Sequence, residues 1–167
     1  MNKLILTTVL FFVVIANVTA QKISDGGTVD VNGLTVTFNI VNKETVTIGG
    51  QNFDRCKVAA TLVNNSGKSF NLRLSSYPQL TAKPELIELD CINATGAKMT
   101  SKRLKLKMNT HYVRATYTSF SKDGQLQNNF LNVTAGYYLD NGETVKDEGI
   151  FIVPQGQAPD VTIRKVM

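Results

Sequence analysis

Apolar and polar residues alternate along most of this chain after residue 20. The clearest case is the segment 34–40, where Leu34, Val36, Phe38 and Ile40 alternate with threonine and asparagine. A period of two residues is that of a β-strand with one buried face. The same alternation recurs from Cys56 to Val63, so the chain is predicted to be rich in β-strands.

Further strands are predicted between turn signals along the rest of the chain. The turns are Asn64–Lys68, Asp123-Gly124 and Asn141-Gly142, whose residues readily adopt positive φ angles. The strands are predicted at residues 70–74, 86–92, 103–108, 111–120, 130–139, 144–153 and 161–163. No stretch shows helical periodicity. Many short strands separated by turns predict an all-β antiparallel sandwich, with a small closed β-barrel as the alternative.

The first twenty residues break this pattern and predict export. Lys3 precedes an almost unbroken apolar run from Leu4 to Ile15, and Val18-Thr19-Ala20 offers small residues for cleavage. This is the pattern of a secretory signal peptide, and the run is too short for a typical membrane span. We expect cleavage after Ala20, which places residues 21–167 as a single domain in the periplasm or outside the cell. No later segment is apolar enough to span a membrane.

The amino-acid composition excludes more classes of function than the net charge does. The formal net charge of +5 falls to +4 when Lys3 leaves with the signal peptide, so the surface is only mildly basic. Tryptophan is absent and histidine occurs once. One histidine and two cysteines do not supply a zinc site, so no metal or cofactor is expected.

Cys56 and Cys91 are predicted to face the core. Cys56 shares strand parity with Val58 and Leu62, and Cys91 shares it with Leu89. Because an exported protein enters an oxidising compartment, we expect these two residues to form a disulfide. The alternative is a pair of separate buried thiols that pack as small apolar residues.

The segment from Cys56 to Phe70 resembles the strand-turn-strand unit of exported bacterial immunoglobulin-like domains. The short signal ending in Ala20-Gln21 is similar to those of small exported proteins of Bacteroidota. The resemblance implies an immunoglobulin-like β-sandwich in an exported setting and implies no reaction. The chain departs from true immunoglobulin domains because it has no tryptophan to pack against a disulfide.

Basic residues form the most prominent candidate binding surface. Arg103, Lys105 and Lys107 alternate with apolar residues, so one face of that strand carries three positive charges. Such a face can bind an anionic glycan or an acidic envelope protein. The alternative is a solvated strand face whose charges prevent edge-to-edge aggregation. Nucleic acid is not expected as a partner, because no aromatic stacking residues accompany the charges.

No catalytic or metal-binding motif is evident. His111 is the only histidine, and its parity places it with Val113 and Tyr117 on what is expected to be a packed face. No nucleophile or acid partner accompanies it at a telling spacing. The acidic residues around Asp140 and Asp147 do not match the spacing of an EF-hand loop.

Two functional hypotheses follow from these observations. The first is a non-catalytic exported sandwich that binds an envelope protein or an anionic glycan through its loops or its basic strand. The second is an envelope hydrolase that uses His111 with a nearby carboxylate or hydroxyl group. A hollow that holds His111 within hydrogen-bond reach of a carboxylate would favour the hydrolase.

Overall fold

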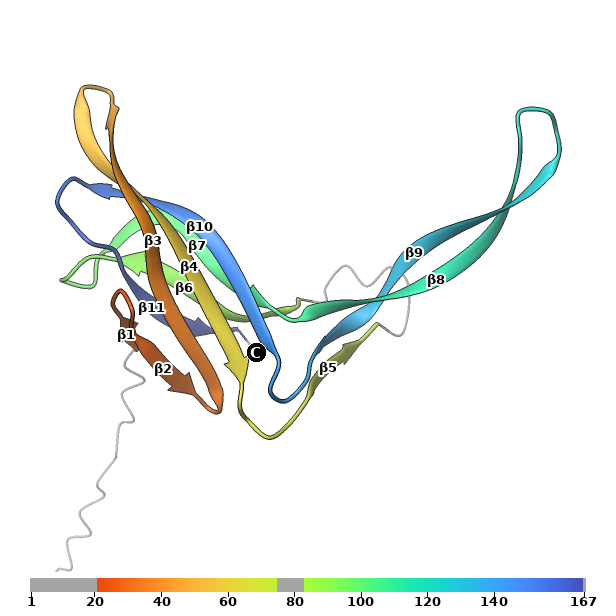
Figure 1. Ribbon diagram of the computed structural model, residues 1–167, viewed down its shortest axis with the longest axis horizontal. Coiled ribbons are helices and arrows are strands. Elements are labelled where there is room, and N and C mark those ends of the chain that lie inside the picture. Colours follow the sequence, from red (N-terminus) through yellow and green to blue (C-terminus); the bar gives the residue numbers. More distant parts are fainter. Residues whose placement is uncertain (1–20, 75–82, 167) are drawn as a thin grey trace, which may run out of the picture.

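The computed structural model describes residues 21–74 and 83–166, so the predicted signal peptide lies outside the described part (Figure 1). Within that part the chain forms eleven strands and no helix. No helix of the described residues is therefore long and apolar enough to cross a membrane. The strands are β1 (Lys22–Ile23), β2 (Thr28–Val31), β3 (Leu34–Ile48), β4 (Gln51–Asn64), β5 (Phe70–Arg73), β6 (Glu85–Ile92), β7 (Lys98–Lys107), β8 (Asn109–Phe120), β9 (Leu126–Leu139), β10 (Thr144–Pro154) and β11 (Asp160–Lys165).

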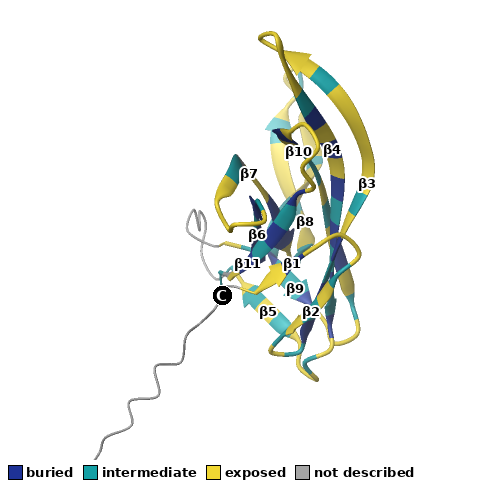
Figure 2. Ribbon diagram, turned by 90° about the vertical axis from the view of Figure 1, so that its left-hand side faces the viewer, coloured by how far each residue is buried: buried dark blue, intermediate teal, exposed yellow. Residues whose placement is uncertain are grey.

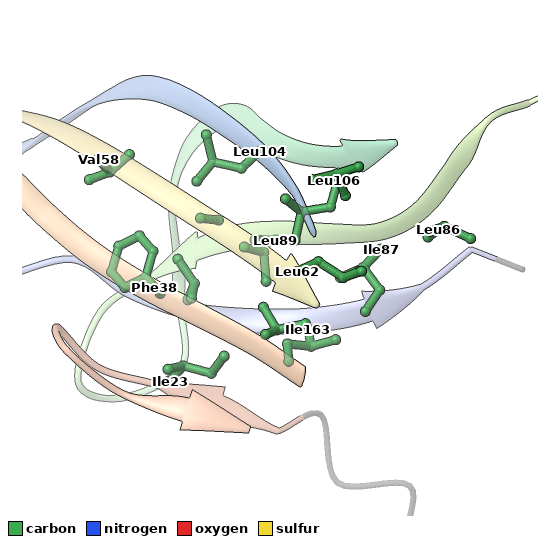
Figure 3. Close-up of a cluster of buried hydrophobic side chains, with 14 of the residues drawn as sticks. Ile23, Phe38, Val58, Leu62, Leu86, Ile87, Leu89, Leu104, Leu106 and Ile163 are labelled. Carbon is green, nitrogen blue, oxygen red and sulfur yellow. The ribbon is translucent and has the colours of Figure 1, made fainter. Parts of the chain in front are cut away.

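Eight of these strands form two four-stranded antiparallel sheets. Their orders are β1-β11-β6-β7 and β10-β4-β3-β2. The buried apolar side chains of both sheets form one cluster, whose members from β3, β4, β6, β7 and β11 meet in Figure 3. The predicted all-β antiparallel sandwich is confirmed, and one of its sheets curls into a half-barrel.

The alternation of the sequence places the core between the sheets. Val36 and Phe38 of β3 and Val58 and Leu62 of β4 are all completely buried. Burying a side chain of this kind contributes roughly 1.5–3 kcal/mol, which explains why the register of these strands is tightly fixed. In β3 the intervening positions, Thr35 and Thr37, are polar and less buried.

The β3–β4 hairpin extends beyond the core. The pairing register shifts between Ile40 and Asn42, and from there the two strands continue to a turn at Gly49-Gly50. Both glycines have positive φ angles, 59° and 78°, which residues with a side chain adopt less readily. Figure 2 shows this outer end as mostly exposed, whereas buried residues line the strands of the sandwich.

The edge strand β7 of one sheet lies against the edge strand β10 of the other. The backbone N–H of Lys105 in β7 donates a hydrogen bond of 2.7 Å to the Asp147 carboxylate of β10. Close to this contact, a Cβ atom on Gly149 would lie 2.8 Å from a methyl group of Leu104. The outer edges of β7 and β10 therefore lie against each other rather than open to solvent.

The predicted disulfide is absent. Cys56 in β4 and Cys91 in β6 are both free thiols, and both are completely buried. Both side chains lie in the core, as their strand parity predicts, but they belong to opposite sheets and the sulfurs are not close. Burial raises the pKa of Cys56, and it raises that of Cys91 to about 12. Each thiol packs as a small apolar group.

The remaining three strands form a separate sheet with the order β5-β9-β8. The short strand β5 pairs only with the residues 136–139 of β9. Beyond this point β8 and β9 continue together as a two-stranded arm that leaves the sandwich (Figure 1). We call residues 112–134 the arm.

Candidate functional site

The arm carries most of the exposed large apolar side chains of the described residues. Ten such side chains are exposed, and seven of them lie on the arm. Phe120 and Leu126 at its tip are 73% and 68% exposed. The seven are Tyr112, Val113, Tyr117, Phe120, Leu126, Phe130 and Leu131. Exposed apolar patches of this kind mark interaction surfaces.

Apolar residues occupy both faces of the arm. Cross-strand partners share a face, so Val113 lies beside Val133, and Ala115 beside Leu131, on one side. Phe120 and Leu126 are partners on the other side, which also carries Tyr112 and Phe130. In a sheet with one solvated face, one side would instead be polar.

Few charges interrupt this surface. The only charged residues of the arm are Arg114, Lys122 and Asp123, and the last two lie in its turn. The Arg114 guanidinium lies 3.8 Å from the ring centre of Phe130, a cation–π contact. The arm is thus nearly neutral, in contrast to the ion-paired strands of the sandwich.

Polar contacts within the arm are sparse. Asn129 donates a side-chain hydrogen bond of 2.7 Å to Ser119, and Thr118 lies 3.3 Å from Asn128. No third strand covers the distal part of the arm among the described residues. Because an isolated two-stranded hairpin is only marginally stable in water, the arm is expected to gain stability from a bound partner.

A hollow of about 490 Å³ lies at the base of the arm. Arg73 of β5 and His111 of β8 flank Gly136 of β9 in one row across the sheet. Tyr138 and Asp140 also line the hollow. A Cβ atom at Gly136 would lie 2.5 Å from the carbonyl oxygen of Leu72, so the close pairing of β5 and β9 requires glycine here.

His111 is exposed, contrary to the packed position expected from its parity. Its ring meets that of Tyr138 edge-on, with the ring centres 6.4 Å apart. Asp140 lines the same hollow, but among the described residues no hydrogen bond joins His111 to a carboxylate. The prediction was wrong because strand parity reports which residues share a face, not whether anything covers that face.

The basic strand face is largely neutralised. Arg103 forms ion pairs with Asp90 and Glu88, and Lys105 lies 3.4 Å from Glu88 and 3.6 Å from Glu85. These carboxylates belong to β6, the strand that pairs with β7. Lys107 is exposed and forms no ion pair among the described residues. The proposed anion-binding stripe is therefore mainly a ladder of cross-strand ion pairs.

The acidic residues after β9 form hydrogen bonds within the turn between β9 and β10 and ion pairs on β10. The Glu143 carboxylate accepts a hydrogen bond of 2.8 Å from the backbone of Asp140, and Asn141 accepts one from Gly67. Glu148 forms ion pairs with Lys57 and Lys146, and these cations lower its pKa. Among the described residues, no group of three or more histidine, cysteine or acidic side chains is placed to hold a metal ion.

A buried carboxylate that the sequence did not single out joins the β3–β4 hairpin to the turn after β10. Asp54 is 2% exposed, and it accepts hydrogen bonds from Gly156 at 2.8 Å and Thr45 at 3.1 Å. Lys43 lies 2.8 Å from the same carboxylate. Asp54 falls on the apolar parity of β4, which is the only signal in the sequence for its burial.

Comparisons with models of protein families, with characterised proteins and with solved structures found no match to this chain.

Proposed function

We propose that this protein is an exported, non-catalytic interaction module that binds a protein partner at the cell envelope through its arm. The observation that carries this proposal is the concentration of seven exposed large apolar side chains on residues 112–134. Aromatic residues account for four of the seven, and these are the residues most enriched at protein interfaces.

The sandwich suits the role of a rigid base for the arm. Its core is closed on both sheets, and β5 pairs with the base of β9 to hold the arm in place. Binding surfaces that a rigid scaffold positions lose little conformational entropy on association. Export, predicted from the first twenty residues, would bring this surface to envelope partners.

Acidic glycan binding by the basic strand has less support. Two of its three cations, Arg103 and Lys105, already contact carboxylates of β6. An anionic ligand would have to compete with these fixed carboxylates. The neutral, apolar arm favours a protein partner instead.

The hollow beside His111 is the best candidate for the alternative hydrolase. It brings His111 and Asp140 to one place. A catalytic histidine needs a neighbouring group that orients its ring and a nucleophile within hydrogen-bond reach. Among the residues that the structure describes, His111 has an edge-on contact with Tyr138 but no hydrogen bond to an orienting group or a nucleophile, so the interaction module remains the better supported proposal.

Photo-crosslinking tests the proposal in the native cell. Benzoylphenylalanine placed at Tyr117 is expected to yield a protein adduct, because Tyr117 lies on the arm and is exposed. The control position is Ile152, a 40% exposed residue of β10 on the sandwich. Adducts at neither position, or equally at both, would contradict docking through the arm.

A matched pair of triple variants gives an independent test. Replacing Phe120, Leu126 and Phe130 with serine removes apolar surface from the arm, and capture of the partner is expected to be lost. The control replaces Val41, Ile48 and Ile152, which are exposed elsewhere. Retained capture by the arm variant would overturn the proposal.

A further inference from the structure

Strand β8 presents a long open edge. Among the described residues, the outermost strands β1, β2 and β5 are short, with two, four and four residues. The part of β3 that extends beyond β2 is also open, but it carries the charged residues Lys43 and Glu44. The edges of β7 and β10 lie against each other through the contact of Lys105 with Asp147. By contrast, β8 has twelve residues, and no strand in the described part of the chain pairs with its outer edge.

The sequence of β8 does not protect this edge. Proteins usually block an open edge strand with lysine, proline or a bulge along it. From Asn109 to Phe120 there is no lysine or proline, and aromatic and β-branched residues predominate. The one irregularity of its pairing lies near the base, between His111 and Tyr112. An unprotected edge of this length is a surface for strand pairing.

Pairing at the edge suits the two-faced character of the arm. A partner that packed on one face would leave the apolar residues of the other face in water. A strand added beside β8 places its side chains next to Val113 and Tyr117 on one face and next to Tyr112 and Phe120 on the other.

We propose that the strand added to β8 is the β8 strand of a second copy of this chain, an inference that rests on the proposed function. The two strands run antiparallel about a two-fold axis at Thr116, and they join the two three-stranded sheets into one sheet of six strands. The uninterrupted register of β8 runs from Tyr112 to Phe120, and Thr116 is its midpoint.

The residues that this register brings together are mutually compatible. Tyr112 of one copy lies opposite Phe120 of the other, Arg114 lies opposite Thr118, and Thr116 lies opposite itself. Aromatic pairs and threonine pairs stabilise antiparallel strands, and no like charges are opposed. A two-fold axis at Arg114 would instead place two guanidinium groups opposite each other.

Charge and the composition of β8 also favour a second copy. The arm carries a single positive charge outside its turn, so two arms do not repel each other strongly. Four of the seven exposed apolar side chains, Tyr112, Val113, Tyr117 and Phe120, lie on β8 itself and therefore beside the added strand. Two-fold dimers are also the commonest oligomers.

The free edge of β9 is less suited to this contact. The part of this edge that extends beyond β5, residues 126–134, contains Asn128, Asn129 and Asn132, and asparagine is depleted in strands. Ala135 has no partner in the register with β8, so the strand is irregular at that end. The contact between copies is therefore assigned to β8.

Charge exchange at Thr116 tests the axis. In sedimentation experiments over a micromolar concentration series, the chain from Gln21 onward is expected to dimerise. Thr116→Lys and Thr116→Glu each place like charges opposite one another on the axis, and each is expected to weaken the dimer at least about tenfold. An equal mixture of the two variants is expected to dimerise again, since opposite charges then meet.

Thr47 provides the matched control position. It is an exposed threonine in the outer part of the β3–β4 hairpin, away from the arm. Thr47→Lys and Thr47→Glu are expected to leave the dimer unchanged. A monomeric wild-type chain at every concentration overturns the proposal, and so does a dimer that neither Thr116 variant weakens or that their mixture does not restore.

A cysteine at the axis tests the register directly. Directly opposed residues of antiparallel strands have Cβ atoms about 4.5–5.5 Å apart, so Thr116→Cys is expected to give a disulfide-linked dimer on mild oxidation. Thr47→Cys is expected to remain monomeric under denaturing, non-reducing conditions. A dimer that Thr116→Cys fails to link contradicts this register.

The crosslink at Tyr117 separates this inference from the proposed function. An adduct with twice the mass of the chain supports the second copy. An adduct with another protein, together with a monomeric purified chain, overturns the dimer and leaves the proposed function standing. No adduct from the arm overturns both.

Discussion

The Nε atom of Arg103 lies 2.8 Å from the Oδ1 atom of Asp90, across the paired strands β7 and β6. The same guanidinium reaches Glu88, whose side chain is only 7% exposed. Hydrogen bonding to Asp90 raises the pKa of Arg103. Burial by itself raises the pKa of Asp90. The hydrogen bonds from Lys98 and Arg103 together lower this pKa by more, so the net shift is downward. Arg103 is thus part of the fold rather than a free cation.

Reversing Arg103 is therefore expected to destabilise the protein. Arg103→Glu places a third carboxylate beside Asp90 and Glu88, and the melting temperature should fall by several degrees. Lys107→Glu is the control, because Lys107 lies on the same strand without an ion pair among the described residues. Surface charges of that kind contribute little to the free energy of unfolding, about 0–1 kcal/mol. Thermal unfolding followed by circular dichroism measures both.

Equal and small effects of the two substitutions would contradict the ion-pair ladder. Retention on heparin then addresses binding separately. If Lys107→Glu alone abolished retention while the fold stayed intact, the stripe would regain its interpretation as an anion-binding face. Added salt should weaken any such retention, because exposed charges are screened over about 8 Å at physiological ionic strength.

Asp54 is expected to make stability depend on acid pH. Hydrogen bonds from Lys43 and from the backbone of Gly156 lower its pKa below the usual value of 3.8. A carboxyl group with a lowered folded-state pKa stabilises the fold above its unfolded pKa, and this contribution disappears as the pH falls through the folded-state pKa. Asp54→Asn should therefore lower the melting temperature near neutral pH but have a diminishing effect below about pH 4.

Melting temperatures of the wild type and Asp54→Asn across the acid range measure this dependence. The control is Asn42→Ala, a substitution at an exposed position on β3 that changes no charge. Its difference from wild type should stay constant with pH. A constant difference for Asp54→Asn as well would show that the carboxylate charge does not stabilise the fold.

The two cysteines are expected to resist both alkylation and oxidation in the folded protein. Both side chains are completely buried, and burial raises the pKa of Cys91 to about 12. Because the thiolate is the reactive form, iodoacetamide at neutral pH should label neither residue before unfolding and both after it. Intact mass spectrometry measures the labels. A mass lower by two hydrogen atoms and no labelling after unfolding would instead demonstrate a disulfide.

Most of the sandwich could be predicted from the sequence because burial imposes alternation. In the segments 34–40 and 56–63 apolar residues recur at every second position, and most of these residues are buried in the core. The outer part of β3, beyond Ile40, lacks a core contact and therefore lacks that signal. The short strands β1 and β2 were missed for a related reason, since two to four residues contain too little pattern to read.

The functional surface was less predictable. Both arm strands were predicted, but Val113 and Tyr117 were expected on a packed face because alternation does not reveal whether a second layer exists. The basic stripe was read correctly as a strand face, yet its partners Glu88 and Asp90 became visible only with the pairing of β6 and β7. The prediction of a disulfide was wrong for a similar reason, since two cysteines that both face the core need not be close to each other.

Gly136 is expected to be essential for joining the arm to its base. A Cβ atom at this position would lie 2.5 Å from the carbonyl oxygen of Leu72 and 3.3 Å from the Cα atom of Arg73. Because both contacts are with backbone, Gly136→Ala forces β5 and β9 apart, at a cost of about 1–3 kcal/mol. The control is Gly149→Ala, whose Cβ meets only the flexible end of Leu104. Unfolding in urea should show a clearly lower midpoint for Gly136→Ala than for Gly149→Ala, and hydrogen exchange should show faster exchange in β5. Equal midpoints would mean that β5 can shift without loss, and the base of the arm would then be less rigid than its pairing with β5 indicates.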